Sequence, residues 1–205
     1  MCFGHALFYD TMTYMTGRTH DLAAFTALNI ALITIPNTPT ISFATAVAAL
    51  GANMLGGLLP DIDNATSDIW DKFRGGNFLA KLVRPLIGGH RMISHSILGI
   101  AIAGWGLKML LPIIGQVLIV DMNVVWWSIM IGVFSHLVTD SMTKDGVPWL
   151  FPIPIRFGIP PLEFMRIKTG GLVEKSIIFP GLITLNTYLI YANYEVFRAL
   201  ARGFF

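Results

Sequence analysis

Long apolar stretches, separated by polar segments that often contain proline, are the dominant pattern of this sequence. They cover residues 22–35, 41–59, 96–120 with a break at Pro112, 124–138 and 177–191. A helix of roughly 15–19 residues rises about 22–28 Å, which approaches the hydrocarbon thickness of a bilayer. The pattern predicts an all-α, polytopic membrane helix bundle of about five apolar helices. A very apolar all-α core, or a protein that enters one leaflet only, is the alternative.

Composition strengthens the membrane prediction and narrows the chemistry. Hydrophobic residues make up 54% of the 205 residues and charged residues only 13%, whereas soluble domains carry about 25% charged residues. The net charge of +2 is too small to indicate a nucleic-acid-binding protein. Cys2 is the only cysteine, which excludes an intramolecular disulfide and a thiolate cluster. Any metal must therefore be held by histidine and carboxylate side chains.

Basic residues in the loops predict the topology. Residues 60–93 and 143–175 each contain five lysines or arginines, whereas residues 36–40 carry no charge and residues 112–123 only Asp121. By the positive-inside rule, both long loops and the N-terminus face the cytoplasm, and five spans place the C-terminus outside. The alternative is that the last segment is kinked at Pro180 and lies in the interface. We expect a leader or interfacial segment over 1–14, one membrane-embedded domain over 15–193 and a tail over 194–205.

Histidines and carboxylates gather at one end of these predicted helices. Each group lies at the end that the topology assigns to the cytoplasm, although the groups are spread over most of the chain: His20 with Asp21, Asp61 with Asp63, His90 with His95, His136 with Asp140, and Glu174. It would be unusual for five helix ends to carry such residues on the same side of the membrane by chance. The pattern predicts a metal cluster on the cytoplasmic side.

The spacing within the groups fits metal binding. His136 and Asp140 are four residues apart, so on a helix they project from one face and can chelate one ion. Pro60 ends the preceding helix, and Asp61 and Asp63 follow it in a turn where carboxylates can bind hard or borderline cations. Each pattern alone also fits an ordinary helix face or turn.

A third group precedes the segment that begins near residue 96. His90 and His95 are five residues apart, so one is expected from the loop after the glycine pair 88–89 and the other from the first helical turn. Ser94 is expected to cap that helix. Asn29 and Asn53, which lie inside apolar segments, are expected to form interhelical hydrogen bonds.

Taken in order, five short motifs resemble one membrane-protein family. They are Thr16-Gly17-Arg18-Thr19-His20, Leu59-Pro60-Asp61-Ile62-Asp63, Gly89-His90-Arg91 with Ser94-His95-Ser96, Ser135-His136-Leu137-Val138-Thr139-Asp140, and Gly146-Val147-Pro148 with Phe151-Pro152. They resemble the YdjM-like family of inner-membrane, metal-dependent hydrolases, over about residues 15–178. That family is similar to the zinc-dependent phospholipase C and P1 nuclease group of all-α enzymes.

The resemblance implies a zinc site and its ligands. The implied ligands are His20, Asp61, Asp63, His90, His95, His136, Asp140 and Glu174. Residues Met92 and Ile93 depart from the small residues that the family carries after His90-Arg91, which affects the expected fit of a substrate. Eight ligands exceed what one tetrahedral zinc with an open position needs, so we expect two or more divalent ions.

The expected chemistry is metal-assisted hydrolysis of a phosphoester in a lipid or another membrane-proximal substrate. Asp61 or Asp63 is the expected general base, and Arg91, Lys144 or Arg156 is expected to bind the phosphate. A metal-ion transporter is one alternative, but transport predicts ionisable residues near the bilayer midplane. A non-catalytic membrane protein whose metals only hold helix ends together is the other.

Overall fold

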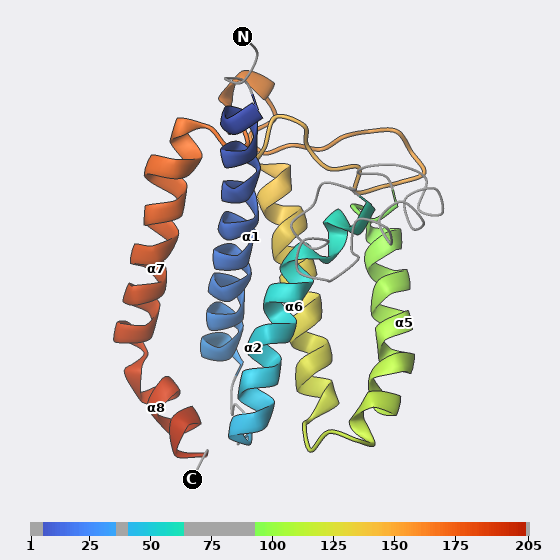
Figure 1. The fold of residues 1–205 in the computed structure, drawn as a ribbon, viewed down its shortest axis with the longest axis vertical. Helices are drawn as coiled ribbons and strands as arrows, with labels where there is room; N and C mark the ends of the chain where they lie inside the picture. The colour runs from blue at the N-terminus through green and yellow to red at the C-terminus, as the bar shows by residue number, and fades with distance from the viewer. Residues whose placement is uncertain (1–5, 36–40, 64–92, 204–205) are drawn as a thin grey trace.

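A computed structural model of the chain describes residues 6–35, 41–63 and 93–203, with side chains described from Gly17 onward and without that of Asp63 (Figure 1). Within this part there are helices and no strands. The α-helices are α1 (Ala6–Thr34), α2 (Phe43–Leu58), α5 (Ile97–Gly115), α6 (Met122–Ser141), α7 (Phe179–Ala192) and α8 (Tyr194–Arg202). Short helices are η1 (Leu59–Asp63), η2 (Glu163–Met165) and the π-helical turn η3 (Glu174–Ile178). The predicted all-α bundle is confirmed.

Helix α6 occupies the centre of this bundle. Helices α1, α2 and α5 pack against it, and α7 packs against α1 (Figure 1). Helices α2 and α6 run in the same direction, because Thr45 contacts Asp121 near their starts and Asn53 contacts Ser128 further along. Both therefore end at the same side of the molecule, which is where α5 and α7 begin.

Three of the described helices are long and apolar enough to cross a membrane: Phe43–Ile62, Ile97–Gly115 and Met122–Ser141. Helix α5 exposes large apolar side chains along its length, including Ile102 and Trp105, as expected for a helix that faces lipid. The other two expected spans fall on α1 and α7, which are helical and complete the bundle but are not among these three.

Two helix starts differ from those expected from the sequence. Helix α1 begins at Ala6, so His20 lies inside the helix and not before it. The N-cap of α5 is Ser96, whose hydroxyl accepts a hydrogen bond from the Gly99 amide, so the expected cap at Ser94 was wrong. An apolar run marks where a helix is buried or faces lipid, and a polar turn of the same helix can extend beyond it.

The contact between α2 and α6 depends on glycine at two positions. A Cβ atom at Gly56 would lie 2.2 Å from the carbonyl oxygen of Ile129, and one at Gly132 would lie 2.2 Å from the carbonyl oxygen of Asn53. The two backbones thus meet without side chains between them, as in small-residue packing of membrane helices. This approach brings the end of α2 within reach of polar side chains on α6.

Buried amides join helices within the apolar bundle. Asn53 of α2 donates to the carbonyl of Ser128 in α6 at 3.1 Å. Asn29 of α1 donates to the side-chain oxygen of Asn186 in α7 at 2.8 Å, and Asn186 donates to Thr26 at 2.7 Å. The expected interhelical hydrogen bonds of Asn29 and Asn53 are confirmed.

The segment from Met142 to Gly171 covers the end of the bundle where α6 finishes (Figure 1). Its backbone is held by the guanidinium of Arg166, which donates to the carbonyls of Lys144, Pro160 and Pro161. Trp149 attaches the segment to α6 through a 2.9 Å hydrogen bond to the Ser141 hydroxyl. Arg166, one of the basic residues that predict the topology, therefore also has a structural role.

The close approach of α2 and α6 predicts a cost for a single methyl group. Gly132→Ala should lower the free energy of unfolding by about 1–3 kcal/mol, because its Cβ would meet backbone atoms that cannot rotate away. Gly51→Ala is the matched control, since nothing lies within 4 Å of a Cβ there, and it should be neutral or slightly stabilising. Thermal unfolding in detergent, followed by helical circular dichroism, compares the two variants; equal midpoints would contradict the packing described.

Candidate metal centre

Five of the predicted ligand side chains meet at the end of the bundle. They come from four parts of the chain: His20 from α1, Asp61 from η1, His95 from the turn before α5, and His136 with Asp140 from α6. Two sets of three have ligand atoms within 4.8 Å of one another, namely His20, His136 and Asp140, and Asp61, His95 and His136. We call these five residues the His/Asp cluster.

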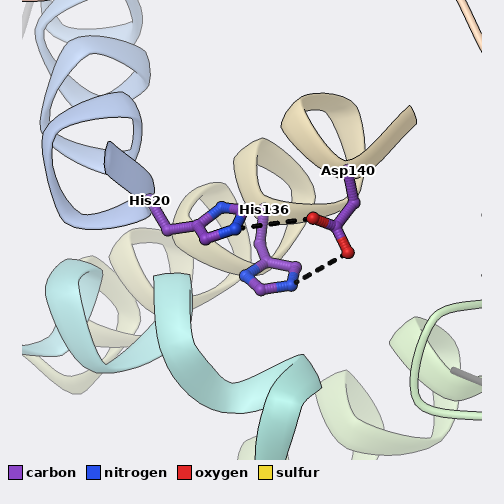
Figure 2. A group of neighbouring side chains, drawn as sticks. All are labelled: His20, His136 and Asp140. Atoms are coloured by element: carbon purple, nitrogen blue, oxygen red, sulfur yellow. Dashed lines mark ion pairs between the residues drawn. The ribbon is translucent and has the colours of Figure 1, made fainter. Parts of the chain in front are cut away.

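Asp140 lies between the three imidazoles of the cluster. Its Oδ1 is 3.4 Å from Nε2 of His20, and its Oδ2 is 3.4 Å from Nε2 of His95 and 3.6 Å from Nε2 of His136. Figure 2 shows His20 reaching from α1 toward Asp140, with His136 on the same helix as the carboxylate. The rings of His20 and His136 are stacked, with centroids 4.1 Å apart, so two imidazoles present their Nε2 atoms side by side.

The separations in the cluster fit a shared ion better than direct hydrogen bonds. Asp61 Oδ1 lies 3.5 Å from Nε2 of His95 and 3.7 Å from Nε2 of His136. Charge-assisted hydrogen bonds are shorter, at about 2.7–2.9 Å. Two ligands bound at about 2.0–2.1 Å in tetrahedral positions around zinc lie about 3.3 Å apart. The donor atoms are therefore spaced like neighbouring ligands of one cation.

The second ring nitrogen, Nδ1, of His20 and of His136 forms a hydrogen bond with a group outside the cluster. Nδ1 of His136 lies 2.6 Å from the carbonyl of Gly57, and Nδ1 of His20 lies 2.8 Å from the hydroxyl of Thr139. A carbonyl can only accept, so Nδ1 of His136 carries its proton. The Thr139 hydroxyl donates to carbonyls of its own helix, so it accepts from His20 in turn. Neutral His20 and His136 then present a bare Nε2 to the cluster, the arrangement typical of metal-ligating histidines.

Burial makes a cation in the cluster energetically reasonable. The side chains of His95, His136 and Asp140 are at most 1% exposed, and Nε2 of His136 makes no hydrogen bond with the described residues. A buried carboxylate or lone pair without compensation is costly. A divalent cation would compensate both, so the donor set fits a metal ion.

A proton competes with a metal at His95. Burial lowers the pKa of His95, but the carboxylates of Asp140 and Asp61 outweigh it and raise the pKa to about 8. Near neutral pH, the metal-free site therefore holds a protonated His95. A metal ligand must be neutral imidazole, so metal binding releases this proton.

The remaining predicted ligands divide into two kinds. His90 and the side chain of Asp63 lie outside the described residues, and so does Arg91, which is a predicted phosphate-binding residue and not a metal ligand. Glu174 is described and belongs to neither set of three. Its two carboxylate oxygens accept hydrogen bonds from the hydroxyl of Thr19 at 2.7 Å and from the amide of Gly170 at 2.6 Å. As a metal ligand, Glu174 stays a prediction.

Glu174 nevertheless adjoins the cluster through α1. Thr19, its partner, precedes His20, and Glu174 and His20 line the same small cavity of about 50 Å³. Glu174 opens the π-helical turn η3, which leads into α7 at Pro180. Proline has no amide proton and its ring displaces the carbonyl four residues earlier, and the wider π turn accommodates it. The structure thus gives Glu174 a helix-joining role next to His20.

Two of the three predicted phosphate-binding residues lie on the loop that follows α6. Lys144 and Arg156 are both exposed, and Arg156 donates to the carbonyl of Asp145 at 3.4 Å. Among the described residues, no hydrogen bond joins Lys144 or Arg156 to the His/Asp cluster, so their role in phosphate binding stays a prediction. The role of three groups that orient the imidazoles was not predicted from the sequence: the Gly57 carbonyl, the Thr139 hydroxyl and the Ser94 hydroxyl, which lies 2.9 Å from Nδ1 of His95.

The number of ions depends on His136, which both sets of three share. One Nε2 binds one ion, so the described residues complete one three-ligand set and leave two ligands of the other. The two oxygens of Asp140 face different imidazoles and could bridge two ions. Two or more ions therefore stay a prediction that depends partly on residues outside the described part.

Comparison with known proteins identifies the family. A family model described as YdjM inner membrane protein matches residues 15–202. The chain belongs to the YdjM family. The match covers every residue of the His/Asp cluster and confirms that the short motifs belong to the YdjM family. The metal-dependent hydrolase activity and the similarity to the phospholipase C and P1 nuclease group stay predictions.

A curated relative and the solved structures complete the comparison. The chain is 32% identical over 177 residues to the uncharacterized protein YvsG of Bacillus subtilis (strain 168), an alignment that covers 86% of this chain and 95% of that protein. No solved structure matches. Membership of the YdjM family and the three candidate spans establish a membrane protein of the inner-membrane type.

His136→Ala should remove metal from the purified protein, because both sets of three lose their shared ligand. We expect affinity for zinc to fall by more than about 100-fold, the upper end of the loss seen when only an outer-shell partner is removed. Elemental analysis after dialysis and competition with a chromogenic chelator measure the change. Glu163→Gln, on the exposed helix η2, is the control. Unchanged metal content in His136→Ala would contradict the site.

Thr139→Val tests the support behind His20 at nearly constant volume. The variant removes the acceptor of the Nδ1 proton, so zinc affinity should fall by about 10-fold or more while the helix remains intact. Thr184→Val is the matched control, because Thr184 bonds only to its own helix at Pro180 and is exposed. The same chelator competition applies, and equal affinities for the two variants would argue against an orienting role.

Proposed function

We propose that the chain is a membrane-embedded, metal-dependent hydrolase that cleaves a phosphoester of a lipid or membrane-proximal substrate, with zinc as its metal. The observation that carries this proposal is the geometry of the His/Asp cluster: three Nε2 atoms and two carboxylates converge at ligand spacing, with each Nδ1 held from behind. Such donor sets are typical of hydrolytic zinc sites.

Asp61 supports a site with access to substrate. Its side chain is 22% exposed, whereas those of His95, His136 and Asp140 are almost completely buried. Structural zinc sites are closed, and catalytic sites keep an accessible position. A cluster with one partly exposed carboxylate at its edge therefore favours catalysis over a purely structural role.

The proposed reaction divides the work between metal and protein. When bound, the metal lowers the pKa of water and stabilises negative charge on phosphate. Asp61, at the exposed edge, would accept the proton of the attacking water while the water oxygen bonds to phosphorus and the ester P–O bond breaks. The leaving oxygen takes a proton from the acid form of the carboxyl or from solvent. Asp63 is the other candidate base, and Arg91, Lys144 and Arg156 are candidate phosphate ligands.

The charge pattern supports a cytoplasmic site. The cluster lies at the end of the bundle where the segment from Met142 to Gly171 lies (Figure 1), and this segment carries Lys144, Arg156, Arg166 and Lys168. At the opposite end, the short connection between α5 and α6 has Asp121 as its charged residue, Lys108 bonds to Asn123, and α8 carries Glu195, Arg198 and Arg202 (Figure 1). By the positive-inside rule, the end with the cluster faces the cytoplasm.

A metal that only holds helices together is the second candidate. The almost complete burial of His95, His136 and Asp140 favours it, since four chain segments meet at these ligands and a cation would fix them. The two candidates differ in what Asp61 does: in a structural site it is one ligand among several, and in a hydrolase it also contacts substrate or water.

Asp61→Asn should separate these candidates. Turnover of a phosphodiester or phospholipid panel should fall by about 100-fold or more, in keeping with the loss of a general base, while thermal stability changes little because the amide keeps the shape of the side chain. Glu163→Gln is the control, and metal content is measured in parallel. If the zinc-loaded wild type turns over no substrate in the panel while chelation lowers its melting temperature, the metal is structural and the hydrolase proposal fails.

A further inference from the structure

An apolar groove lies between η1 and α5, beside the His/Asp cluster. Its volume is about 340 Å³, within the usual range for pockets that bind small ligands. Leu59, Pro60 and Ile62 form one wall, and Ile100, Ile102 and Ala103 of α5 form the other. The walls offer almost no hydrogen-bonding side chains, so the groove suits an apolar ligand.

One end of the groove adjoins the metal centre. Pro60 and Ile62 line the groove on either side of Asp61 in the chain. Ser94 also lines it and contacts Nδ1 of His95. Val133 forms part of the groove one helical turn before His136 on α6. A ligand in the groove would therefore have one end next to residues that adjoin Asp61, His95 and His136.

The side of the groove formed by α5 continues into a surface that fits lipid. Both walls belong to candidate membrane spans, Phe43–Ile62 and Ile97–Gly115. Ile102 lines the groove and is 52% exposed, and Leu98 and Trp105 on the same helix are 43% and 68% exposed. Apolar side chains at this exposure are stable where hydrocarbon covers them. The groove is thus continuous with the lipid-facing surface of a membrane protein.

We propose that this groove binds an acyl chain of a phospholipid whose phosphate lies at the His/Asp cluster. The inference rests on the proposed function and names its substrate class: a phosphoester that carries a long apolar chain. Two observations support it: the walls of the groove are apolar, and the donor set beside one end of the groove fits a divalent cation that would bind phosphate. A soluble sugar phosphate or nucleotide would place polar groups against these walls without partners, which is costly.

The length of the groove suits part of an acyl chain. Residues 97–103 of α5 span about 9 Å at 1.5 Å per residue, enough for the part of the acyl chain nearest the headgroup. The rest of the chain would continue past Ile102 into the surrounding lipid. The substrate would then be reached from within the membrane, with only its headgroup at the aqueous edge.

Photo-crosslinking tests the occupant directly in the full-length, zinc-loaded protein. The protein is placed in phosphatidylglycerol nanodiscs that contain a phosphatidylglycerol with a diazirine in its acyl chain, and labelled peptides are located by mass spectrometry. We expect labels to concentrate on Ile100 and Ala103 relative to Ala101, which lies on the same helix outside the groove. Equal labelling of Ala101 and Ala103 would indicate only the surrounding lipid and would overturn the proposal, as would an unlabelled groove.

A substitution that fills the groove provides a second test with a matched control. Ala103→Phe should reduce labelling in the groove by about tenfold or more, since a single methylene in an apolar pocket already changes binding to that extent. Ala101→Phe makes the same substitution at an exposed position and should leave groove labelling unchanged. Melting temperature and zinc content of both variants are compared with the wild type. A folded, zinc-loaded Ala103→Phe that keeps full labelling would overturn the proposal.

Hydrolysis of a soluble phosphodiester, bis(p-nitrophenyl) phosphate, separates the two proposals. If the hydrolase proposal and the groove both hold, Ala103→Phe loses turnover of the long-chain lipid and keeps turnover of the soluble ester. If the wild type cleaves the soluble ester but no lipid labels the groove, the groove proposal fails and the hydrolase proposal stands. If lipid labels the groove in a protein that cleaves neither compound, the hydrolase proposal fails and the acyl-chain site stands.

Discussion

The close backbone contact between α2 and α6 is the constraint on which the rest of this structure depends. Gly56 and Gly132 allow the two helices to meet at main-chain distance, and the next residue, Gly57, then presents its carbonyl to Nδ1 of His136. That single hydrogen bond fixes the tautomer and direction of the ring. Because η1 follows α2 without a break, the same contact also carries Asp61 to the cluster. The two glycines therefore determine both the packing of α2 on α6 and the geometry of the candidate metal site.

Electrostatics explains why such a polar cluster is tolerated beside an apolar bundle. Two carboxylates and three imidazoles lie together with little solvent, and buried charges are stable only when they compensate one another. A proton on His95 supplies part of that compensation, and a divalent cation would supply more. The cluster can therefore exchange the proton of His95 for a divalent cation. A bound cation would in turn attract the negatively charged phosphate that is proposed to bind there.

Much of the site could be predicted from the sequence because its residues occur at the ends of apolar runs. The i, i+4 pair of His136 and Asp140 and the turn after Pro60 fix local geometry by chain connectivity alone. The all-α bundle and the interhelical roles of Asn29 and Asn53 followed from hydrophobicity in the same way. The supporting groups could not be found so easily. A backbone carbonyl such as that of Gly57 has no sequence signature, and nothing in the sequence distinguishes Thr139 from other threonines within helices. The cap is Ser96 and not Ser94, because the Ser94 hydroxyl bonds to the ring of the next residue, His95, which itself belongs to the cluster.

The positions of the ligands along the chain bear on how the protein is made. All five cluster residues lie between His20 and Asp140, so they have been synthesised before α7 leaves the ribosome, and domains form from the N-terminus during synthesis. Helix α7 then adds Asn186 to α1 and, through η3, Glu174 to Thr19. The last helix closes around a site whose described ligands are already in place. The described donor set can therefore form before the bundle is complete, while the chain is still attached to the insertion machinery.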